Sequence, residues 1–323
     1  MKKKKIIVVL GLLLLAIVIV AALWFVSEKK ELFLTEYEEN EEDDFLVYDG
    51  KKYEYNEHLS NFLIMGIDTR EENSKEKNPT AAGQADAILL VSYDRVEQTV
   101  KCITIPRDTM TTIHMFSPEG EDLGTAIDHL NIQYAFGNGK EKSCELMKEA
   151  VQTLLYDVPI QGYCAVNMDG IPVAVDAVGG VELVVPDDTL ENVYPEFQEG
   201  DTVIITKENA ERFVRYRDTN IQQSAIARGN RQKVFMRAFA ENAKVKAAKD
   251  EKFVVELYDD IKPYMVTNMG NDIFAKLLQA ENNAEMLEIP GKSVSGEQFD
   301  EYRVDEGELY KMMLEVFYKE VQE

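Results

Sequence analysis

The longest apolar run in the chain lies at its start, where residues 6–26 are uncharged and mostly aliphatic. A helix of that length spans a bilayer, and the lysines at 2–5 favour a cytoplasmic N-terminus. No small-residue cleavage site stands out, so the pattern predicts a retained anchor rather than a cleaved signal peptide. We therefore expect a cytoplasmic stub at 1–5, a transmembrane anchor at 6–26, and a single-pass membrane protein whose C-terminal domain is extracytoplasmic.

The pattern changes after the anchor, where residues 27–59 are expected to form an acidic spacer and a small hairpin. The run EYEENEEDD at 36–44 should be solvated. The following FLVYDGKKYEY alternates on both sides of Asp49-Gly50, a pair that favours a tight turn. The folded domain is expected at 60–323.

Three strand-like runs open this domain. They are NFLIMGI, AILLVSYD and TVKCITI. If neighbouring strands pair antiparallel, the end of the first, the start of the second and the end of the third share one edge of a sheet. Asp68, Asp86 and Arg107 stand at these three points, so we expect them to converge.

Helical and strand-like periods alternate through the rest of the domain. Helices are expected at DHLNIQYAFG, KEKSCELMKEAVQTLL, 171–178, 207–217, 229–245 and DIFAKLLQAEN. Strands are expected at GYCAVNM, VELVVP and AEMLEIP, and VELVVP should be buried. FVVELY could form either a strand or a helix. Gly179-Gly180 should close the helix at 171–178. The last helix has one apolar face, formed by Leu309, Met312, Met313, Val316 and Phe317. Strands interleaved with helices predict an α/β domain with helices on both faces of a sheet.

The charge pattern adds one unusual feature. The chain has a formal charge of −24, yet six of its ten arginines lie between Arg212 and Arg237. Guanidinium groups match phosphate or carboxylate oxygens, so the cluster indicates either a polyanion site or helix faces that pair with nearby acids. The acidic balance argues against nucleic acid as a partner.

Several other kinds of chemistry lose support. The three histidines lack the close spacing of a zinc site, and there is no Gly-x-Ser-x-Gly, Walker A or Gly-x-Gly-x-x-Gly motif. Cys102, Cys144 and Cys164 are too few for a disulfide framework. What remains is two acids at strand ends and a set of arginines. Two carboxylates can hold Mg²⁺ when phosphate and water supply the other ligands, although such acids can equally cap turns or pair with arginines.

Seven stretches, in order, resemble the LytR-CpsA-Psr family of membrane-anchored enzymes that attach glycopolymers to peptidoglycan in Gram-positive bacteria. They are FLIMGIDTR, QADAILLVSYD, ITIPRDT, HLNIQYAFG, VDAVGGVELVV, RFVRYRD and RGNRQ, and they cover about residues 60 to 240. The resemblance implies a three-layer α/β/α domain with a central mixed sheet. It also implies an apolar tunnel for a polyprenyl chain whose pyrophosphate lies among arginines at the tunnel mouth.

The resemblance also implies residue roles. Asp68 and Asp86 match the magnesium-binding acids, and Arg107 matches the arginine of the Pro-Arg-Asp motif; these three would be catalytic. Together with Arg107, the pyrophosphate-binding set would be Arg70, Arg215, Arg217, Arg228, Arg231 and Gln232. The implied Mg²⁺-dependent reaction transfers a glycopolymer from polyprenyl pyrophosphate to a peptidoglycan hydroxyl, with Asp68 as the candidate base. The polymer could be a teichoic acid, a capsule polysaccharide or another wall polysaccharide.

Three positions depart from the pattern of the family. Gln84 stands where an arginine is usual, His129 where a lysine is usual, and Ala225-Ile226-Ala227 where Asp-Phe-Gly is favoured. Each change removes a charge or a flexible glycine near the phosphate. We hypothesise that the protein is active but binds pyrophosphate more weakly or uses a different donor.

Three alternatives remain open. The protein could be a non-catalytic, membrane-tethered module that binds polyprenyl pyrophosphate or polymer, although retention of both acids favours an enzyme. It could be a pyrophosphatase that uses water in the same site. A membrane-bound gene regulator is less expected, because only five residues precede the span.

Overall fold

The computed structural model describes residues 45–70, 82–117, 119–218, 224–280, 286–296 and 299–321. The expected stub, anchor and acidic run lie outside these residues. Within the described ranges, no helix is both long and apolar enough to cross a membrane. The chain divides into two compact units, Met1–Glu54 and Tyr55–Glu323, which are described separately.

The first unit contains the predicted hairpin. Strand β1 (Leu46–Tyr48) pairs antiparallel with β2 (Lys51–Tyr55). The two residues between them, Asp49 and Gly50, have φ angles of 49° and 76°. Positive φ at both central positions is the geometry of a type I′ turn, which suits the twist of a hairpin. The hairpin prediction is confirmed.

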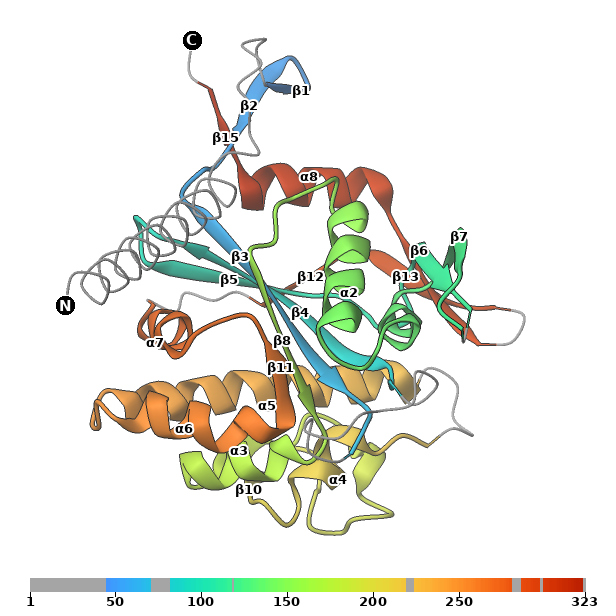
Figure 1. The fold of residues 1–323 in the computed structure, drawn as a ribbon. Helices are drawn as coiled ribbons and strands as arrows, with labels where there is room; N and C mark the ends of the chain where they lie inside the picture. The colour runs from blue at the N-terminus through green and yellow to red at the C-terminus, as the bar shows by residue number, and fades with distance from the viewer. Residues whose placement is uncertain are drawn as a thin grey trace, which may run out of the picture. The chain divides into compact units, whose positions relative to one another are not determined.

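A six-stranded mixed sheet forms the centre of the second unit, in the order β11-β8-β3-β4-β5-β12 (Figure 1). The strands are β3 (Leu59–Ile67), β4 (Ala85–Asp94), β5 (Thr99–Thr104), β8 (Gly162–Asn167), β11 (Met265–Thr267) and β12 (Met286–Glu288). Strands β3, β4 and β5 form the predicted antiparallel meander. Strand β8 runs parallel to β3, and β12 runs parallel to β5, so the sheet is mixed.

Helices lie on both faces of this sheet (Figure 1). One face is covered by α2 (Glu141–Leu154) and α8 (Glu306–Phe317), and the other by α3 (Gly170–Val178), α5 (Ser224–Ala247), α6 (Phe253–Ile261) and α7 (Asn271–Gln279). Because side chains alternate along β3, Leu63 and Met65 pack in the core with α2 and α8, whereas Phe62 packs with residues of α5, α6 and α7. The predicted α/β arrangement is confirmed, and the segment FVVELY is helical.

A smaller, two-stranded ladder packs with α3, α5 and α6 on one side of the central sheet. Strand β9 (Val181–Val184) pairs antiparallel with β10 (Thr202–Ile205). As predicted, α3 ends at Gly179, whose φ of 77° is left-handed. The prediction that VELVVP is a buried strand is half wrong, because Glu182 and Val184 are exposed. A strand in a two-stranded ladder buries one face only, and Val181 and Leu183 occupy it.

Two further predictions need correction. The segment DHLNIQYAFG is not one α-helix, because Asp128 and His129 end strand β7 (Asp122–His129) and only Leu130–Phe136 is helical, as the 3₁₀ helix η2. Pairing of His129 with Met110 in β6 (Met110–Phe116) holds this part extended. The arginine-rich segment also differs, since α4 spans only Ala210–Arg215 and α5 begins at Ser224, before the expected Gly229.

Other elements were not predicted. The most important is the hairpin of β13 (Gly291–Ser295) and β14 (Asp300–Val304), which contacts β6. The remaining short elements are η3 (Asp188–Leu190), η4 (Lys262–Tyr264) and β15 (Tyr318–Glu320).

Candidate active site

The structure brings Asp68, Asp86 and Arg107 together at one edge of the central sheet. Asp68 follows β3, Asp86 is the second residue of β4, and Arg107 follows β5. Two backbone N–H groups tie the first two strand ends: Asp68 donates to the Gln84 carbonyl at 3.0 Å, and Gln84 donates to Asp68 Oδ1 at 2.6 Å. The guanidinium group of Arg107 forms an ion pair with Asp86. Antiparallel pairing therefore produces the convergence that the sequence predicts.

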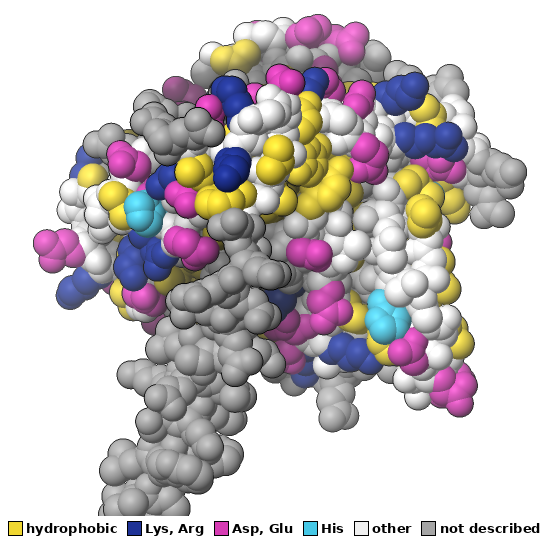
Figure 2. Space-filling view, turned by 90° about the horizontal axis from the view of Figure 1, so that it is seen from above, with side chains coloured by type: hydrophobic (Ala, Val, Ile, Leu, Met, Phe, Trp, Pro, Cys, Tyr) yellow, Lys and Arg dark blue, Asp and Glu magenta, His cyan; other side chains and the backbone are white. Residues whose placement is uncertain are grey.

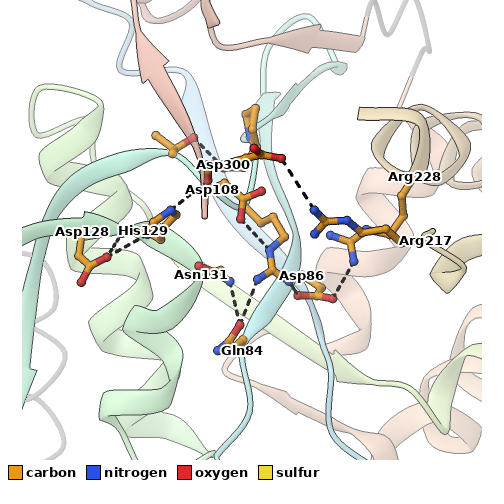
Figure 3. Close-up of polar contacts among 12 residues, drawn as sticks. Gln84, Asp86, Asp108, Asp128, His129, Asn131, Arg217, Arg228 and Asp300 are labelled. Atoms are coloured by element: carbon orange, nitrogen blue, oxygen red, sulfur yellow. Dashed lines mark hydrogen bonds and ion pairs between the residues drawn. The ribbon is translucent and has the colours of Figure 1, made fainter. Parts of the chain in front are cut away.

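The Arg107 guanidinium is held by three acceptors, Gln84, Asp86 and Asp108, whose side chains are labelled in Figure 3. Its Nε donates to Asp108 Oδ1 at 3.0 Å, one terminal nitrogen donates to Asp86, and the other donates to Gln84 Oε1 at 3.1 Å. Gln84 Oε1 also accepts from Asn131 Nδ2 at 2.9 Å. The side chain is thereby fixed in orientation before any ligand binds, which is the preorganisation that electrostatic catalysis requires.

Asp86 lies between two arginines. Its carboxylate is only 13% exposed, and its Oδ2 is 3.4 Å from a terminal nitrogen of Arg228, whose side chain is 9% exposed. Burial raises the pKa of Asp86 above its usual value, while the neighbouring charges of Arg107 and Arg228 oppose that rise. Burial lowers the pKa of Arg228, because it disfavours the charged form of this side chain as well. The Asp86–Arg228 ion pair is thus shielded from water. Electrostatic interactions are stronger in such a low-dielectric environment than in water.

The other predicted arginines fall into different environments. Arg70 and Arg215 are both 51% exposed and share Glu211 as an ion-pair partner. Arg70 also contacts Asp169 at 3.1 Å, and its pKa is raised mainly by its hydrogen bond to Glu211. Both guanidinium groups could exchange these exposed partners for a ligand phosphate at modest cost.

Arg217 is placed by a different contact. Its Nε donates to Ser224 Oγ at 3.1 Å, at the start of α5, and a terminal nitrogen lies 3.9 Å from Asp300 Oδ2. Figure 3 shows its guanidinium reaching between Arg228 and Asp300. The side chain is 29% exposed, so it lies at the border of the buried cluster.

Arg231 is in a separate, interior position. Its side chain is 1% exposed and donates to the Phe213 carbonyl and to Asp187, both at 3.1 Å. It also donates to Thr189 Oγ1 and to the Tyr216 carbonyl. These contacts tie α5 to α4 and η3, so the structure gives Arg231 a role in holding the segment that carries the other arginines. Gln232 donates to the Val214 carbonyl at 3.2 Å.

His129, one of the departures from the family pattern, joins two hairpins. Its Nδ1 lies 3.0 Å from Asp128 Oδ1, and its Nε2 lies 3.1 Å from the Asp300 carbonyl oxygen (Figure 3). The side chain is 17% exposed. Both ring nitrogens have protein partners, so His129 fixes β14 against β7.

One apolar cavity extends from the charged cluster into the layer between the sheet and the helices, and a second apolar cavity lies next to it. The front apolar cavity has a volume of about 220 Å³, and its charged end is formed by Asp86, Arg215, Arg228 and Gln232. Gly66 and Ala87, paired across β3 and β4, line it with little side-chain volume. The rear apolar cavity, of about 240 Å³, is lined almost entirely by carbon and shares wall residues with the front one (Ile64, Val166, Ile171 and Phe235).

Asp68 and Asp86 are the carboxylates that could hold a divalent cation. Asp68 is exposed, and its negative charge helps to raise the pKa of Asp86. A cation between the two would relieve this repulsion. Among the described residues, no group of three or more His, Cys, Asp or Glu side chains could hold a metal alone. A cation here would need oxygens from a bound ligand and water, as Mg²⁺ commonly does beside phosphates.

Sequence reasoning did not single out four residues of this neighbourhood. Asp108 and Asn131 lie inside recognised stretches, and their proximity to Arg107 and Gln84 could have marked them. Glu211 lies one helical turn before Arg215, a spacing that favours ion pairs. Asp300 gave no signal, because it lies far along the chain in a hairpin that was not predicted.

Acidic and basic side chains are mixed on the face of the molecule shown in Figure 2. Among the residues coloured in that view there is no continuous basic stripe of the kind that follows a nucleic acid backbone.

Comparison with known proteins places these features in context. Residues 26–317 match the LytR_cpsA_psr family. A relative from Halalkalibacterium halodurans, named polyisoprenyl-teichoic acid–peptidoglycan teichoic acid transferase TagU, is 32% identical over 176 residues, which are 54% of this chain and 50% of that protein. A Bacillus mycoides protein of the same name is 26% identical over 231 residues, 71% of this chain and 68% of that protein. The match to the first relative thus spans about half its length.

Solved structures share the fold. The crystal structure of B. subtilis TagV aligns with a TM-score of 0.60 at 22% identity, covering 81% of this chain and 96% of that one. TagT bound to LI-WTA aligns with a TM-score of 0.60 at 21% identity, covering 80% and 90%. The mixed α/β fold with its central mixed sheet is common to these structures.

Proposed function

The chain belongs to the LytR-CpsA-Psr family, and from this premise we propose that it is a transferase that moves a glycopolymer from a polyprenyl-pyrophosphate carrier to peptidoglycan. The names of its relatives support a teichoic acid as one such polymer. The observation that carries the proposal is the front apolar cavity, which ends at Asp86, Arg215, Arg228 and Gln232. One site thus offers space for a lipid chain and charge for its pyrophosphate.

The donor would bind in two parts. Burying the polyprenyl chain in the two apolar cavities removes apolar surface from water, which is favourable in proportion to the area buried. Arg215 and Arg228 would receive the pyrophosphate where the front cavity meets the charged cluster. Arg70 and Arg217, close to this cluster and partly exposed, would contribute further donors.

The proposed reaction is a phosphoryl-type displacement. The oxygen of a peptidoglycan hydroxyl forms a bond to the phosphorus nearest the polymer, and the bond from that phosphorus to the bridging oxygen breaks. Polyprenyl phosphate leaves, and the hydroxyl proton passes to a carboxylate. Asp68 is our candidate for this base, because it is exposed while Asp86 is enclosed by Arg107 and Arg228. The two arginines would stabilise the charge on the transferring group.

We include Mg²⁺ in the proposal. Asp68 and Asp86 would hold it together with phosphate oxygens and water, and it would neutralise phosphate charge. We also propose that residues 6–26 anchor the chain in the cell membrane with the catalytic domain outside. The carrier lipid in the outer leaflet and the peptidoglycan would then both be within reach.

The test uses the full chain in detergent with Mg²⁺, a lipid-pyrophosphate-linked saccharide and peptidoglycan fragments, with products followed by mass spectrometry. A saccharide–phosphate–peptidoglycan adduct that Asp86→Ala abolishes is the expected result. Release of lipid phosphate without the adduct would indicate a pyrophosphatase. Donor binding without turnover in either protein would indicate a non-catalytic binding module.

A further inference from the structure

A third cavity, the polar cavity, adjoins the front apolar cavity beneath α5. It has a volume of about 130 Å³ and shares Asp86, Ala87, Arg228, Gln232 and Met236 with the front cavity. The remaining walls differ. The front cavity is lined from β3 and β8, whereas the polar cavity is lined from the end of β5, from β13 and from β14. Because β4 lies between β3 and β5 in the sheet, the two cavities lie on opposite sides of Asp86.

The lining of the polar cavity suits a ligand with many hydroxyl groups. Arg107, Asp108, Asn230 and Ser293 contribute hydrogen-bonding groups. Lys233 and Glu288, which also line it, form an ion pair with side chains 28% and 41% exposed. Such a set offers donors and acceptors along the wall, whereas the front apolar cavity has polar groups only at its charged end and the rear one is almost entirely apolar. The polar cavity also has apolar wall from Ile88, Ile105 and Met236. A sugar ring could satisfy more of its hydroxyl groups here than in the apolar cavities.

The ring of Tyr302 forms a fixed apolar part of the wall. Its hydroxyl group donates to the Ile289 carbonyl at 2.6 Å, and its backbone N–H donates to the Asp108 carbonyl at 2.8 Å. The position of the ring is therefore set before a ligand arrives. An immobile ring beside polar side chains matches the mixed surface of a pyranose, with its C–H groups and its hydroxyls.

We propose that the polar cavity binds the sugar that carries the acceptor hydroxyl, an inference that rests on the proposed transferase function. In phosphoryl transfer the attacking and leaving oxygens lie roughly in line on opposite sides of the phosphorus. If the carrier lipid occupies the front apolar cavity, the leaving oxygen faces the β3 side of Asp86. The attacking hydroxyl then approaches from the β5 side, where the polar cavity lies. The first sugar of the donor hangs from an equatorial oxygen and does not need this space.

Gly229 is the position chosen for filling the polar cavity, because an added Cβ atom has room there. It lies on α5, lines the cavity, and a Cβ atom built on it meets no heavy atom within 4 Å apart from its chain neighbours and the adjacent helix backbone. A helical glycine is less favourable than alanine by about 1 kcal/mol, so Gly229→Ala should not destabilise α5, and urea unfolding checks that the larger substitutions remain folded. The series Gly229→Ala, Gly229→Leu and Gly229→Phe fills the space in steps. Ala174→Phe is the matched variant in the rear apolar cavity, which Ala174 lines.

The decisive measurement is the kinetics of transfer by the full chain, with donor and acceptor varied separately. The acceptor KM should rise through the Gly229 series, by about tenfold or more for Gly229→Phe, while the donor KM stays within about twofold. Ala174→Phe should show the reverse. A donor KM that rises with the acceptor KM in Gly229→Phe would overturn the proposal, because the cavity would then hold the sugar of the donor. Unchanged kinetics in Gly229→Phe would overturn it as well.

Direct binding separates this inference from the proposed function. A soluble N-acetylglucosamine–N-acetylmuramic acid disaccharide is titrated into isotope-labelled protein and followed by NMR. Saturable shifts in the wild type that Gly229→Phe loses would support the acceptor site even if no transfer occurs. Absence of saturable shifts in the wild type, or equal binding by Gly229→Phe, would refute the site.

Discussion

The backbone N–H of Gln84 donates a 2.6 Å hydrogen bond to the carboxylate of Asp68, and the N–H of Asp68 donates back to the Gln84 carbonyl at 3.0 Å. Through its side chain the same glutamine accepts from Arg107 and Asn131. Gln84 therefore connects Asp68 to Arg107, the arginine that forms an ion pair with Asp86. Gln84 is a positioning residue in this account, because it orients groups of the site.

Loss of the Gln84 side chain should weaken catalysis. In Gln84→Ala, Arg107 loses one of its three acceptors, and hydrogen bonds to charged groups contribute about 1.5–3 kcal/mol each. We expect kcat to fall about tenfold or more with a smaller change in donor KM, measured by steady-state transfer kinetics. Gln84→Glu, which keeps an acceptor at the same place, should retain more activity than Gln84→Ala. Equal kcat in Gln84→Ala and wild type would contradict the positioning role.

Gln84→Arg tests the sequence-based hypothesis of weak donor affinity. If the missing charge limits binding, the substitution lowers the donor KM. The structure predicts the opposite, because an arginine cannot accept from Arg107 or Asn131 and adds a like charge beside Arg107. A rise in donor KM would support the structural view, and a fall would restore the affinity hypothesis.

Alanine substitutions of Arg231 and Arg215 should affect different properties, stability in the first case and donor binding in the second. Arg231→Ala removes a buried guanidinium that four acceptors surround, and breaking such a buried pair costs about 3–5 kcal/mol. Arg215→Ala removes a half-exposed ion pair, which costs about 1 kcal/mol or less, yet it should weaken donor binding. Urea unfolding and donor titration distinguish the two. A fully stable Arg231→Ala that binds donor poorly would show that Arg231 contacts the ligand.

The burial of Asp86 predicts a pH-dependent difference in stability between wild type and Asp86→Asn. Burial raises the folded-state pKa of Asp86, so the folded protein favours the protonated form. As pH rises from the ordinary Asp pKa through the raised value, wild type should lose stability relative to Asp86→Asn and then level off. Urea unfolding of both proteins in EDTA, from about pH 3.5 to 7, measures the difference. A relative gain of wild-type stability with rising pH would mean that the two arginines outweigh burial.

Magnesium should bind together with a phosphate ligand. Because two carboxylates alone leave most of the coordination sphere to water, Mg²⁺ by itself should raise the melting temperature little. Mg²⁺ with a soluble prenyl pyrophosphate should raise it more than either component, and Asp68→Asn should remove the extra shift. Thermal unfolding at several Mg²⁺ concentrations checks this. An unchanged extra shift in Asp68→Asn would exclude that carboxylate as a ligand.

The sequence predicted best what depends on neighbouring residues. The meander of β3, β4 and β5 and the convergence of Asp68, Asp86 and Arg107 follow from short connections and strand polarity. The amphipathic periods of α2 and α8 were equally clear, because each helix buries one face against the sheet.

What the sequence could not show depends on contacts between distant segments. Arg231 looked like its neighbours in the motif, yet Asp187 and two backbone carbonyls hold it in the interior. His129 is tied to the carbonyl of Asp300, which lies 171 residues further along the chain. The β13–β14 hairpin contains few apolar residues, so its sequence pattern resembles that of a loop. Because the hairpin was not predicted, the wall that it contributes to the polar cavity was not predicted either.

The central claim is that the charged cluster and the two apolar cavities form one site for a lipid pyrophosphate. The most direct measurement is the affinity of the full chain for prenyl pyrophosphates of increasing length, in wild type and in Ala174→Phe. We predict that wild-type affinity rises with each added isoprene unit until the cavities are filled, and that Ala174→Phe loses the gain from the longer chains only. Affinity that does not depend on chain length, or an equal loss for all lengths in Ala174→Phe, would contradict the account.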